Sequence, residues 1–180
     1  WDVQTQAAHH YNKRDDTHRR LDSKLDTLQQ KNLNNWVKAT LINSAVLPKY
    51  SILDLACGKG GDLPKWAKQG IGHYVGVDIA YKSICDGIER YNQTGLTSAR
   101  AKCNFPAIWC AGNFVKERFF DELEKREPGI RFDAVSCQFA LHYSWTSFKD
   151  ARTALHNAAS RLKAGGLFVG TTTDANVLVK

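Results

Sequence analysis

The segment from Ser51 to Asp62, SILDLACGKGGD, constrains the fold more than any other part of the chain. A short apolar run, Ile52 and Leu53, leads through Asp54 into a turn with three glycines in four residues, and a helical stretch follows. This order predicts a buried parallel strand, a tight loop and a helix N-terminus. Glycine has no Cβ and tolerates positive φ, so a ligand can approach the backbone of such a loop closely.

The glycine spacing excludes two common nucleotide-binding loops. Aligning the first two glycines with the Gly-x-Gly-x-x-Gly dinucleotide motif puts Leu63 at the third glycine, and the loop lysine lacks the Ser or Thr of a P-loop. The remaining pattern, Asp54-x-Ala56-x-Gly58-x-Gly60, resembles the first motif of Rossmann-like S-adenosylmethionine methyltransferases, with Ala56 in place of the first glycine. Alanine is tolerable there if its φ is negative.

Apolar strands alternate with helical stretches along most of the chain. Strands are expected from about 51 and over 73–77, 107–111, 132–137 and 167–171; helices are expected over 32–47, 63–69, 83–92, 114–127 and 146–162. This alternation is typical of an α/β fold with a doubly wound, mostly parallel sheet and helices on both faces. A Rossmann-like methyltransferase sheet also has a C-terminal hairpin, so we expect those last strands to be absent from this chain.

The N-terminal part differs in character from the rest. Residues 1–31 alternate in charge and are expected to form a polar arm or frayed helix, mostly in solvent, ahead of a binding domain over 32–180 that is truncated at its C-terminus. In the helix expected over 32–47, Leu33, Trp36 and Ile42 follow the apolar helical spacing. Asn34 and Lys38 share another face, which is either solvated or turned towards a ligand, and spacing alone favours solvent.

Composition narrows the function only slightly. The 180 residues carry a formal charge of +7 with a pI near 9.2, which suits a polyanionic partner such as RNA but is weak evidence alone. The five cysteines form no C-x-x-C pair, so we expect reduced, mostly buried thiols in an intracellular protein and no metal site. No apolar run is long enough to cross a membrane.

Acidic residues follow the first two strands. Asp54 can serve the ammonium of S-adenosylmethionine, and Asp78, about 20 residues on, has the spacing of a ribose-binding acid. The alternative for Asp78 is a helix N-cap, and the alternative for Asp54 is a strand-end acid capping the loop. Gly112-Asn113 and residues 138–143 follow the next two strands, so all these positions are expected at one edge of the sheet.

Several motifs together resemble the mRNA cap guanine-N7 methyltransferase family. They include Gly-Lys-Gly-Gly-Asp-Leu at 58–63, Cys-Gln-Phe-x-x-His-Tyr-Ser at 137–144, Asn-Asn-Trp-Val-Lys at 34–38, Asp-Ile-Ala at 78–80 and Arg-Tyr at 90–91. The resemblance covers roughly residues 7–180. Two departures are Ala56 and the Gly112-Asn113 pair, which stands where the family has an acid that meets the adenine amino group.

The resemblance assigns roles to individual positions. It implies that the cofactor S-adenosylmethionine is bound by Lys38, Asp54, Ala56, Gly58, Asp78, Ile79, Gly112, Asn113, Gln138 and Tyr143. It also implies that the capped RNA is bound by Asn34, Asn35, Lys59, Lys65, Arg90 and His142. From the residues alone, the simpler interpretation is a solvated helix position for Lys65 and Arg90, a surface position for Lys38 and a core histidine for His142. The motif matches favour the binding roles instead.

The implied activity is methyl transfer from S-adenosylmethionine to N7 of the cap guanine, with no residue acting as general acid or base. The implied partners are a GpppN-terminated RNA and, in addition, other capping-enzyme domains or an activating subunit. The implied location is nuclear, or cytoplasmic for a virus that replicates there. Two alternatives stay open: a Rossmann-like methyltransferase with another substrate, and a non-catalytic RNA-binding module of a capping protein.

Overall fold

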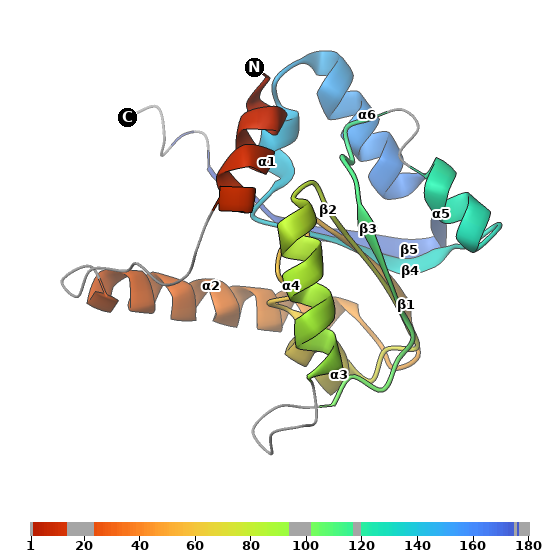
Figure 1. The fold of residues 1–180 in the computed structure, drawn as a ribbon. Helices are drawn as coiled ribbons and strands as arrows, with labels where there is room; N and C mark the ends of the chain where they lie inside the picture. The colour runs from red at the N-terminus through yellow and green to blue at the C-terminus, as the bar shows by residue number, and fades with distance from the viewer. Residues whose placement is uncertain (1, 14–23, 94–101, 117–119, 175, 177–180) are drawn as a thin grey trace.

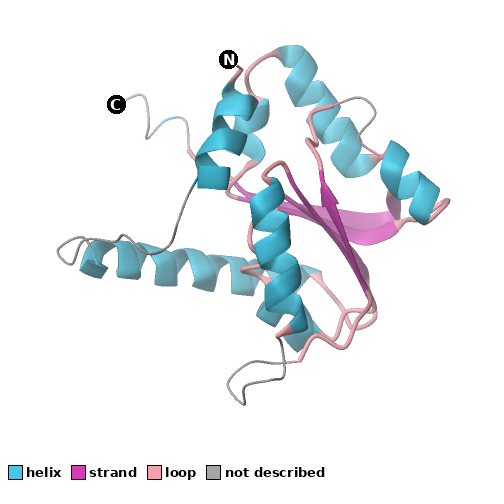
Figure 2. Cartoon of the chain, in the orientation of Figure 1, coloured by secondary structure: helices cyan, strands magenta, loops and turns pink. Residues whose placement is uncertain are grey.

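The computed structural model describes residues 2–13, 24–93, 102–116, 120–174 and 176. It has a single five-stranded sheet in the order β3-β2-β1-β4-β5 with every neighbouring pair parallel, and helices lie on both faces of the sheet (Figure 1, Figure 2). The strands are β1 (Ser51–Leu55), β2 (His73–Asp78), β3 (Ala107–Ala111), β4 (Phe132–Gln138) and β5 (Leu162–Thr171). The helices are α1 (Val3–Lys13), α2 (Lys24–Ala45), α3 (Leu63–Gln69), α4 (Tyr81–Asn92), α5 (Asp121–Arg126), the short 3₁₀ helix η2 (Leu141–Ser144) and α6 (Phe148–Ala159). The predicted doubly wound α/β fold is confirmed.

The three central strands, β1, β2 and β4, bury both of their faces because helices cover the sheet on both sides, whereas the edge strands β3 and β5 are more exposed. On β1, Ile52 packs with Trp66 of α3 and Ile42 of α2, whereas Leu53 packs on the opposite side with Leu123 of α5. The alternation of side chains along a strand produces this division. It also places Asp54 on the same side of the sheet as Ile52, directly among core side chains.

The strand order changes direction between β1 and β4. β2 and β3 extend the sheet to one side of β1, and β4 and β5 extend it to the other. The loops that leave the carboxyl ends of β1 and β4 therefore diverge and open a crevice between them, which is where open α/β sheets bind ligands.

Several predicted boundaries are wrong, among them that of the helix expected over 146–162, which is α6 at Phe148–Ala159, and two of the differences have local causes. Of the helix expected over 114–127, the described residues, which exclude 117–119, contain only α5, and Asn113 Oδ1 accepts a hydrogen bond from the Val115 N–H (3.0 Å) that holds the start of this range in a turn. The strand expected over 167–171 begins earlier, at Leu162, because β5 contains a bulge. Its pairing with β4 jumps from Phe132–Leu162 to Ala134–Leu167, and Gly165 has φ of 78°.

Helix α2 begins earlier and packs less than its sequence suggests. It starts at Lys24 rather than at 32, and it extends past the edge of the sheet (Figure 1). Leu33 and Trp36, expected on a buried apolar face, are 58% and 65% exposed, while Ile42 near the other end is fully buried. Among the described side chains of α2, from residue 28 on, only those in its C-terminal turns reach the core. None of the described helices is both long and apolar enough to span a membrane.

Candidate functional site

A cavity of about 380 Å³ lies at the carboxyl edge of the sheet. The loops that follow β1, β2, β3 and β4 all contribute to it, and α1 borders it as well. Ten of the sequence-predicted site residues line this cavity: Lys38, Asp54, Ala56, Gly58, Lys59, Asp78, Ile79, Asn113, Gln138 and Tyr143. Of the predicted cofactor residues, only Gly112 is outside the lining, and it borders a smaller neighbouring cavity. The parallel topology thus gathers positions that are far apart in the sequence.

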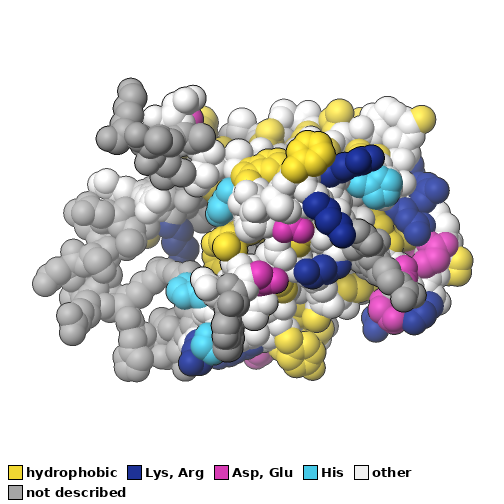
Figure 3. Space-filling view, turned by 90° about the horizontal axis from the view of Figure 1, so that it is seen from above, with side chains coloured by type: hydrophobic (Ala, Val, Ile, Leu, Met, Phe, Trp, Pro, Cys, Tyr) yellow, Lys and Arg dark blue, Asp and Glu magenta, His cyan; other side chains and the backbone are white. Residues whose placement is uncertain are grey.

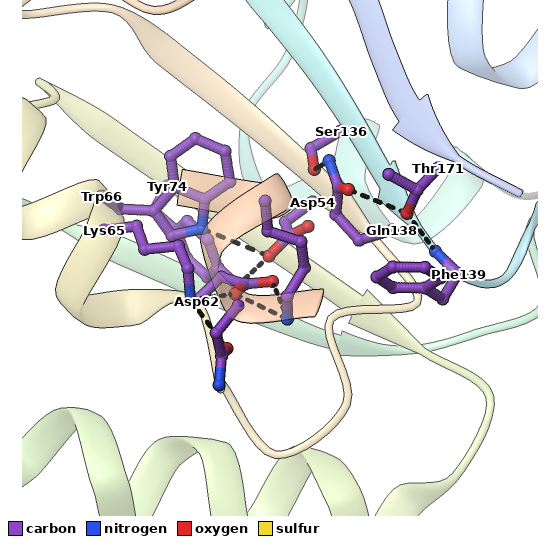
Figure 4. Close-up of polar contacts among 11 residues, drawn as sticks. Asp54, Asp62, Lys65, Trp66, Tyr74, Ser136, Gln138, Phe139 and Thr171 are labelled. Atoms are coloured by element: carbon purple, nitrogen blue, oxygen red, sulfur yellow. Dashed lines mark hydrogen bonds and ion pairs between the residues drawn. The ribbon is translucent and has the colours of Figure 1, made fainter. Parts of the chain in front are cut away.

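Among the acidic residues of the site, Asp54 has the most strongly shifted pKa. Its side chain is 3% exposed, and its Oδ2 accepts hydrogen bonds from Trp66 Nε1 (3.3 Å) and the Tyr74 hydroxyl (3.0 Å) (Figure 4). Burial raises the pKa of Asp54 to about 7, and the nearby Asp62 charge adds to the rise, although both hydrogen bonds and Lys38 oppose it. The carboxyl is therefore poised to ionise near neutral pH when a cation approaches.

Asp78 connects the first two loops. Its Oδ2 accepts from the Gly58 N–H and its Oδ1 from the Ala80 N–H, each at 2.8 Å. Burial raises the pKa of Asp78, while these two backbone bonds act against the rise. The N-cap of α4 is Ala80, so the predicted alternative of Asp78 as that cap is wrong. A carboxylate has about four acceptor positions, so Asp78 retains capacity for ligand hydroxyls.

Asp62 organises the basic side chains beside the cavity, and sequence reasoning missed it. Lys38 Nζ lies 2.8 Å and Lys65 Nζ 2.7 Å from Asp62 Oδ1, and Lys65 Nζ also donates to Asn35 Oδ1 at 3.2 Å (Figure 4). Asp62 is 9% exposed and makes no side-chain cap bond to α3, the role its position would suggest. It therefore fixes α2 against the glycine loop.

The predicted RNA-binding residues are only partly brought together. Lys59 lines the cavity and pairs with Asp86 of α4 at 2.9 Å, and Arg90 lies one helical turn further along α4. His142 packs against Tyr143 in a tilted arrangement with ring centroids 4.3 Å apart, and its buried Nδ1 has no hydrogen-bond partner among the residues that the structure describes. Asn34, Asn35, Lys65, Arg90 and His142 do not line the cavity itself, and their roles stay predictions.

Helix α1 covers part of the cavity. The polar sequence of this helix did not predict that position. Gln4 is 6% exposed; its Nε2 lies 3.4 Å from Asp150 Oδ2 and its Oε1 accepts from Asn113 Nδ2 at 3.2 Å. The Tyr11 and Tyr143 hydroxyls are 3.3 Å apart. Most of α1 is exposed, as predicted for the arm, but Gln4 and Tyr11 face the site. Both amide atoms of Asn113 are engaged within the protein, one by Gln4 and one by the Val115 N–H.

The φ of Ala56 is positive, whereas a negative φ was expected for an alanine at this position. Its φ is +55°, in the left-handed region that alanine adopts only at a cost, so a negative φ does not explain why alanine stands there. Phe139, which also lines the cavity, has φ of +56° and is fixed by hydrogen bonds from its N–H to Thr171. The glycine loop therefore holds local strain next to the cavity.

Replacing Ala56 with glycine should relieve this strain. We expect A56G to raise the free energy of unfolding by about 1 kcal/mol and the melting temperature by about 2–4 °C, measured by chemical and thermal denaturation. The matched control is A67G inside α3, where glycine should instead cost about 0.5–1 kcal/mol. A destabilised A56G protein would contradict the assigned backbone conformation.

Comparison with known proteins extends these observations. A family model described as the mRNA (guanine-N(7))-methyltransferase domain matches residues 1–180. The chain is 44% identical over 174 residues to mRNA cap guanine-N(7) methyltransferase 1 of Oryza sativa subsp. japonica, with 97% of this chain and 46% of the relative covered. It is 45% identical over 177 residues to the protein of the same name in Arabidopsis thaliana, with the same coverage of both chains. The chain thus spans less than half the length of these curated relatives.

Solved structures resemble the chain in fold. Magnesium protoporphyrin IX methyltransferase from Synechocystis PCC 6803, solved with bound SAM, superposes with a TM-score of 0.60 at 18% identity over 91% of this chain and 73% of that one. A TehB-like SAM-dependent methyltransferase from Corynebacterium glutamicum gives a TM-score of 0.54 at 20% identity, over 82% and 71%. At these identities the likeness shows a common α/β architecture.

Proposed function

This chain belongs to the mRNA (guanine-N(7))-methyltransferase family, and we propose that it forms the S-adenosylmethionine-binding part of an enzyme that methylates N7 of the cap guanine of mRNA. One observation carries the proposal: the cavity at the switch in strand order is lined by Asp54 and Asp78 together with the glycine loop. We infer the reaction from membership of the family, and we propose this cavity as the binding site of the methyl donor.

The residues of the cavity fit the chemistry of that cofactor. Gly58 has φ of +55°, and an added Cβ there would meet no protein atom within 4 Å, so the space above the loop is open. Asp78 offers acceptor capacity for ribose hydroxyls, and Asp54 offers a carboxyl that ionises on meeting an ammonium. Ile79, Phe114 and Val115 provide the apolar part of the lining that a purine needs.

The chain's own residues need to position the reactants rather than to move protons. When bound, S-adenosylmethionine supplies an electrophilic methyl group on a sulfonium. The acceptor N7 is a neutral nitrogen with an exposed lone pair, so no base has to remove a proton from it. Holding the two reactants in line can supply about 7–11 kcal/mol of the barrier reduction. Asp62, Lys38 and Thr171 contribute by fixing the walls of the cavity.

The phosphate side of the proposal rests on Lys59, which lines the cavity and belongs to the glycine loop. Arg90 and Lys65 are placed on neighbouring helices and would meet the triphosphate bridge or flanking RNA. The phosphate contacts of such cations position a substrate without selecting its sequence. A nuclear location, and contacts with other capping domains or an activating subunit, belong to the same proposal; the relatives with this family's name come from plants, animals and fungi.

A methyl-transfer assay tests the function directly. We expect radiolabel from S-adenosylmethionine to enter GpppN-capped RNA and to be recovered at N7 of the cap guanine after nuclease digestion, while 5′-triphosphate RNA of the same sequence stays unlabelled. Equal labelling of both RNAs would instead favour a methyltransferase with another substrate. No calorimetric heat with S-adenosylhomocysteine and no labelling would favour a non-catalytic RNA-binding module.

A further inference from the structure

One face of α6 carries aromatic and basic side chains that no step above uses. Phe148, Lys149, Arg152 and His156 border a common groove along this helix. Phe148 is 83% exposed, the largest exposed fraction among the large hydrophobic side chains described. Trp145, just before the helix, is 49% exposed. Figure 3 shows hydrophobic, basic and histidine side chains beside one another on the face of the molecule seen from above. We call the side chains of Phe148, Lys149, Arg152 and His156 the α6 face.

The composition of the α6 face matches one kind of partner. An exposed ring beside lysine and arginine is the arrangement by which proteins bind single-stranded nucleic acid, with a base stacked on the ring and phosphates near the cations. The helix spans roughly 18 Å, long enough to follow several nucleotides. Asp150, the acid in the first turn of α6, takes part in contacts with Thr146, Ser147 and Gln4. The net charge of +7 also favours a polyanion.

The α6 face lies next to the cavity in the structure. Asn157, which borders the groove, donates from Nδ2 to the backbone oxygens of Phe114 (2.8 Å) and Lys116 (2.9 Å), and Phe114 lines the cavity. Tyr143, also in the lining, is part of η2, and only a short turn separates the end of η2 at Ser144 from Phe148. An RNA whose first nucleotide is held at the cavity can therefore reach α6 with its next few nucleotides.

We propose that the α6 face binds the RNA chain downstream of the cap, so that bases stack on Phe148 and phosphates contact Arg152 and Lys149. The proposal rests on the proposed function, because it extends the same substrate beyond its cap. On this proposal, the affinity of the enzyme for capped RNA depends on the length of the RNA, and residues outside the cavity cause this dependence.

The test compares capped RNA of about ten nucleotides with the cap dinucleotide GpppG, which is too short to reach α6. We expect F148A to weaken binding of the longer RNA about tenfold, and R152A to reduce the slope of log affinity against log salt by about 0.7. Methylation of GpppG and binding of S-adenosylhomocysteine should stay at the wild-type level in both variants. R131A, which removes an exposed arginine just before β4 at the opposite edge of the sheet, is the matched charge control.

The outcomes separate this proposal from the proposed function. If F148A and R152A bind the longer RNA as tightly as R131A does, the α6 face is not an RNA surface, even when GpppG is methylated normally. If the wild-type protein does not methylate GpppG or capped RNA, the proposed function fails instead. The same variant should also be tested with an acidic peptide that carries the same charge as the RNA. If F148A loses as much affinity for this peptide as for the RNA, the α6 face is a general polyanion site, and the assignment to RNA is overturned.

Discussion

Replacing Asp78 with alanine is expected to weaken binding of S-adenosylmethionine and S-adenosylhomocysteine by at least about 100-fold and to abolish methyl transfer. Each hydrogen bond to a charged group contributes about 1.5–3 kcal/mol, and a ribose diol would make two with this carboxylate. The substitution also releases the N–H groups of Gly58 and Ala80, which Asp78 holds at 2.8 Å, so the two loops lose their shared acceptor.

Binding should be measured by titration calorimetry, and folding by circular dichroism. We expect D78A to stay folded, because the substitution also removes the cost of burying a carboxylate whose pKa is raised by burial. D78N keeps an acceptor oxygen and the shape, so its affinity should fall between those of D78A and the wild type. D86A, which removes an acid from the surface pair with Lys59, is the control for general charge effects on the cofactor. Wild-type affinity in D78A would rule out the ribose contact.

The second large effect concerns pH and Asp54. The pKa of Asp54 is raised from 3.8 to about 7 in the folded protein, so between these values the folded state holds a proton that the unfolded state has lost. The unfolding free energy therefore falls as pH rises from about 4 to 7, by up to about 4 kcal/mol for this group. D54N has no such proton to lose, and its stability should be flatter over this window and higher than that of the wild type at pH 8.

The pH dependence of cofactor affinity should have the opposite sign to that of the unfolding free energy, and Asp54 should cause both. A cofactor ammonium favours ionised Asp54, so the affinity of the wild-type protein should rise with pH up to about 7 and binding should release protons near pH 6–7. Calorimetry in buffers of different ionisation enthalpy measures this release directly. D54N should bind more weakly and release no proton. The unfolding free energies of the wild type and D54N should be plotted against pH. Plots that run parallel from pH 4 to 8 would contradict the assigned ionisation.

The sequence predicted those features that follow from local patterns. Alternating apolar strands and helices indicated the parallel sheet, and the acids at strand ends indicated which edge holds the cavity. The positions of the first four strands agreed because a buried strand is a short, largely apolar run, such as Ile52 to Leu55, bounded by polar or glycine residues.

The features that the sequence did not predict depend on contacts between distant segments. Gln4 lies in a polar stretch, and only its packing against Asn113 and Asp150 reveals that it covers the cavity. Asp62 resembled a helix cap, but it is held by two lysines from different helices. The left-handed φ of Ala56 was missed because alanine rarely adopts it, and residue type was the only signal available. The predicted division into 1–31 and 32–180 stays a prediction.

The hydrogen bonds from Trp66 and Tyr74 to Asp54 have an evolutionary consequence. Tyr74 packs against Phe105 and Trp109, so these interior rings form one cluster with the tyrosine that holds the carboxyl. A lineage that exchanged Tyr74 for phenylalanine would keep its hydrophobic volume but would shift the proton affinity of Asp54. With Asp54 holding the methyl donor as proposed, substitutions at these aromatic positions would affect cofactor binding as well as packing, and we expect these positions to change more slowly in evolution than their burial alone would require.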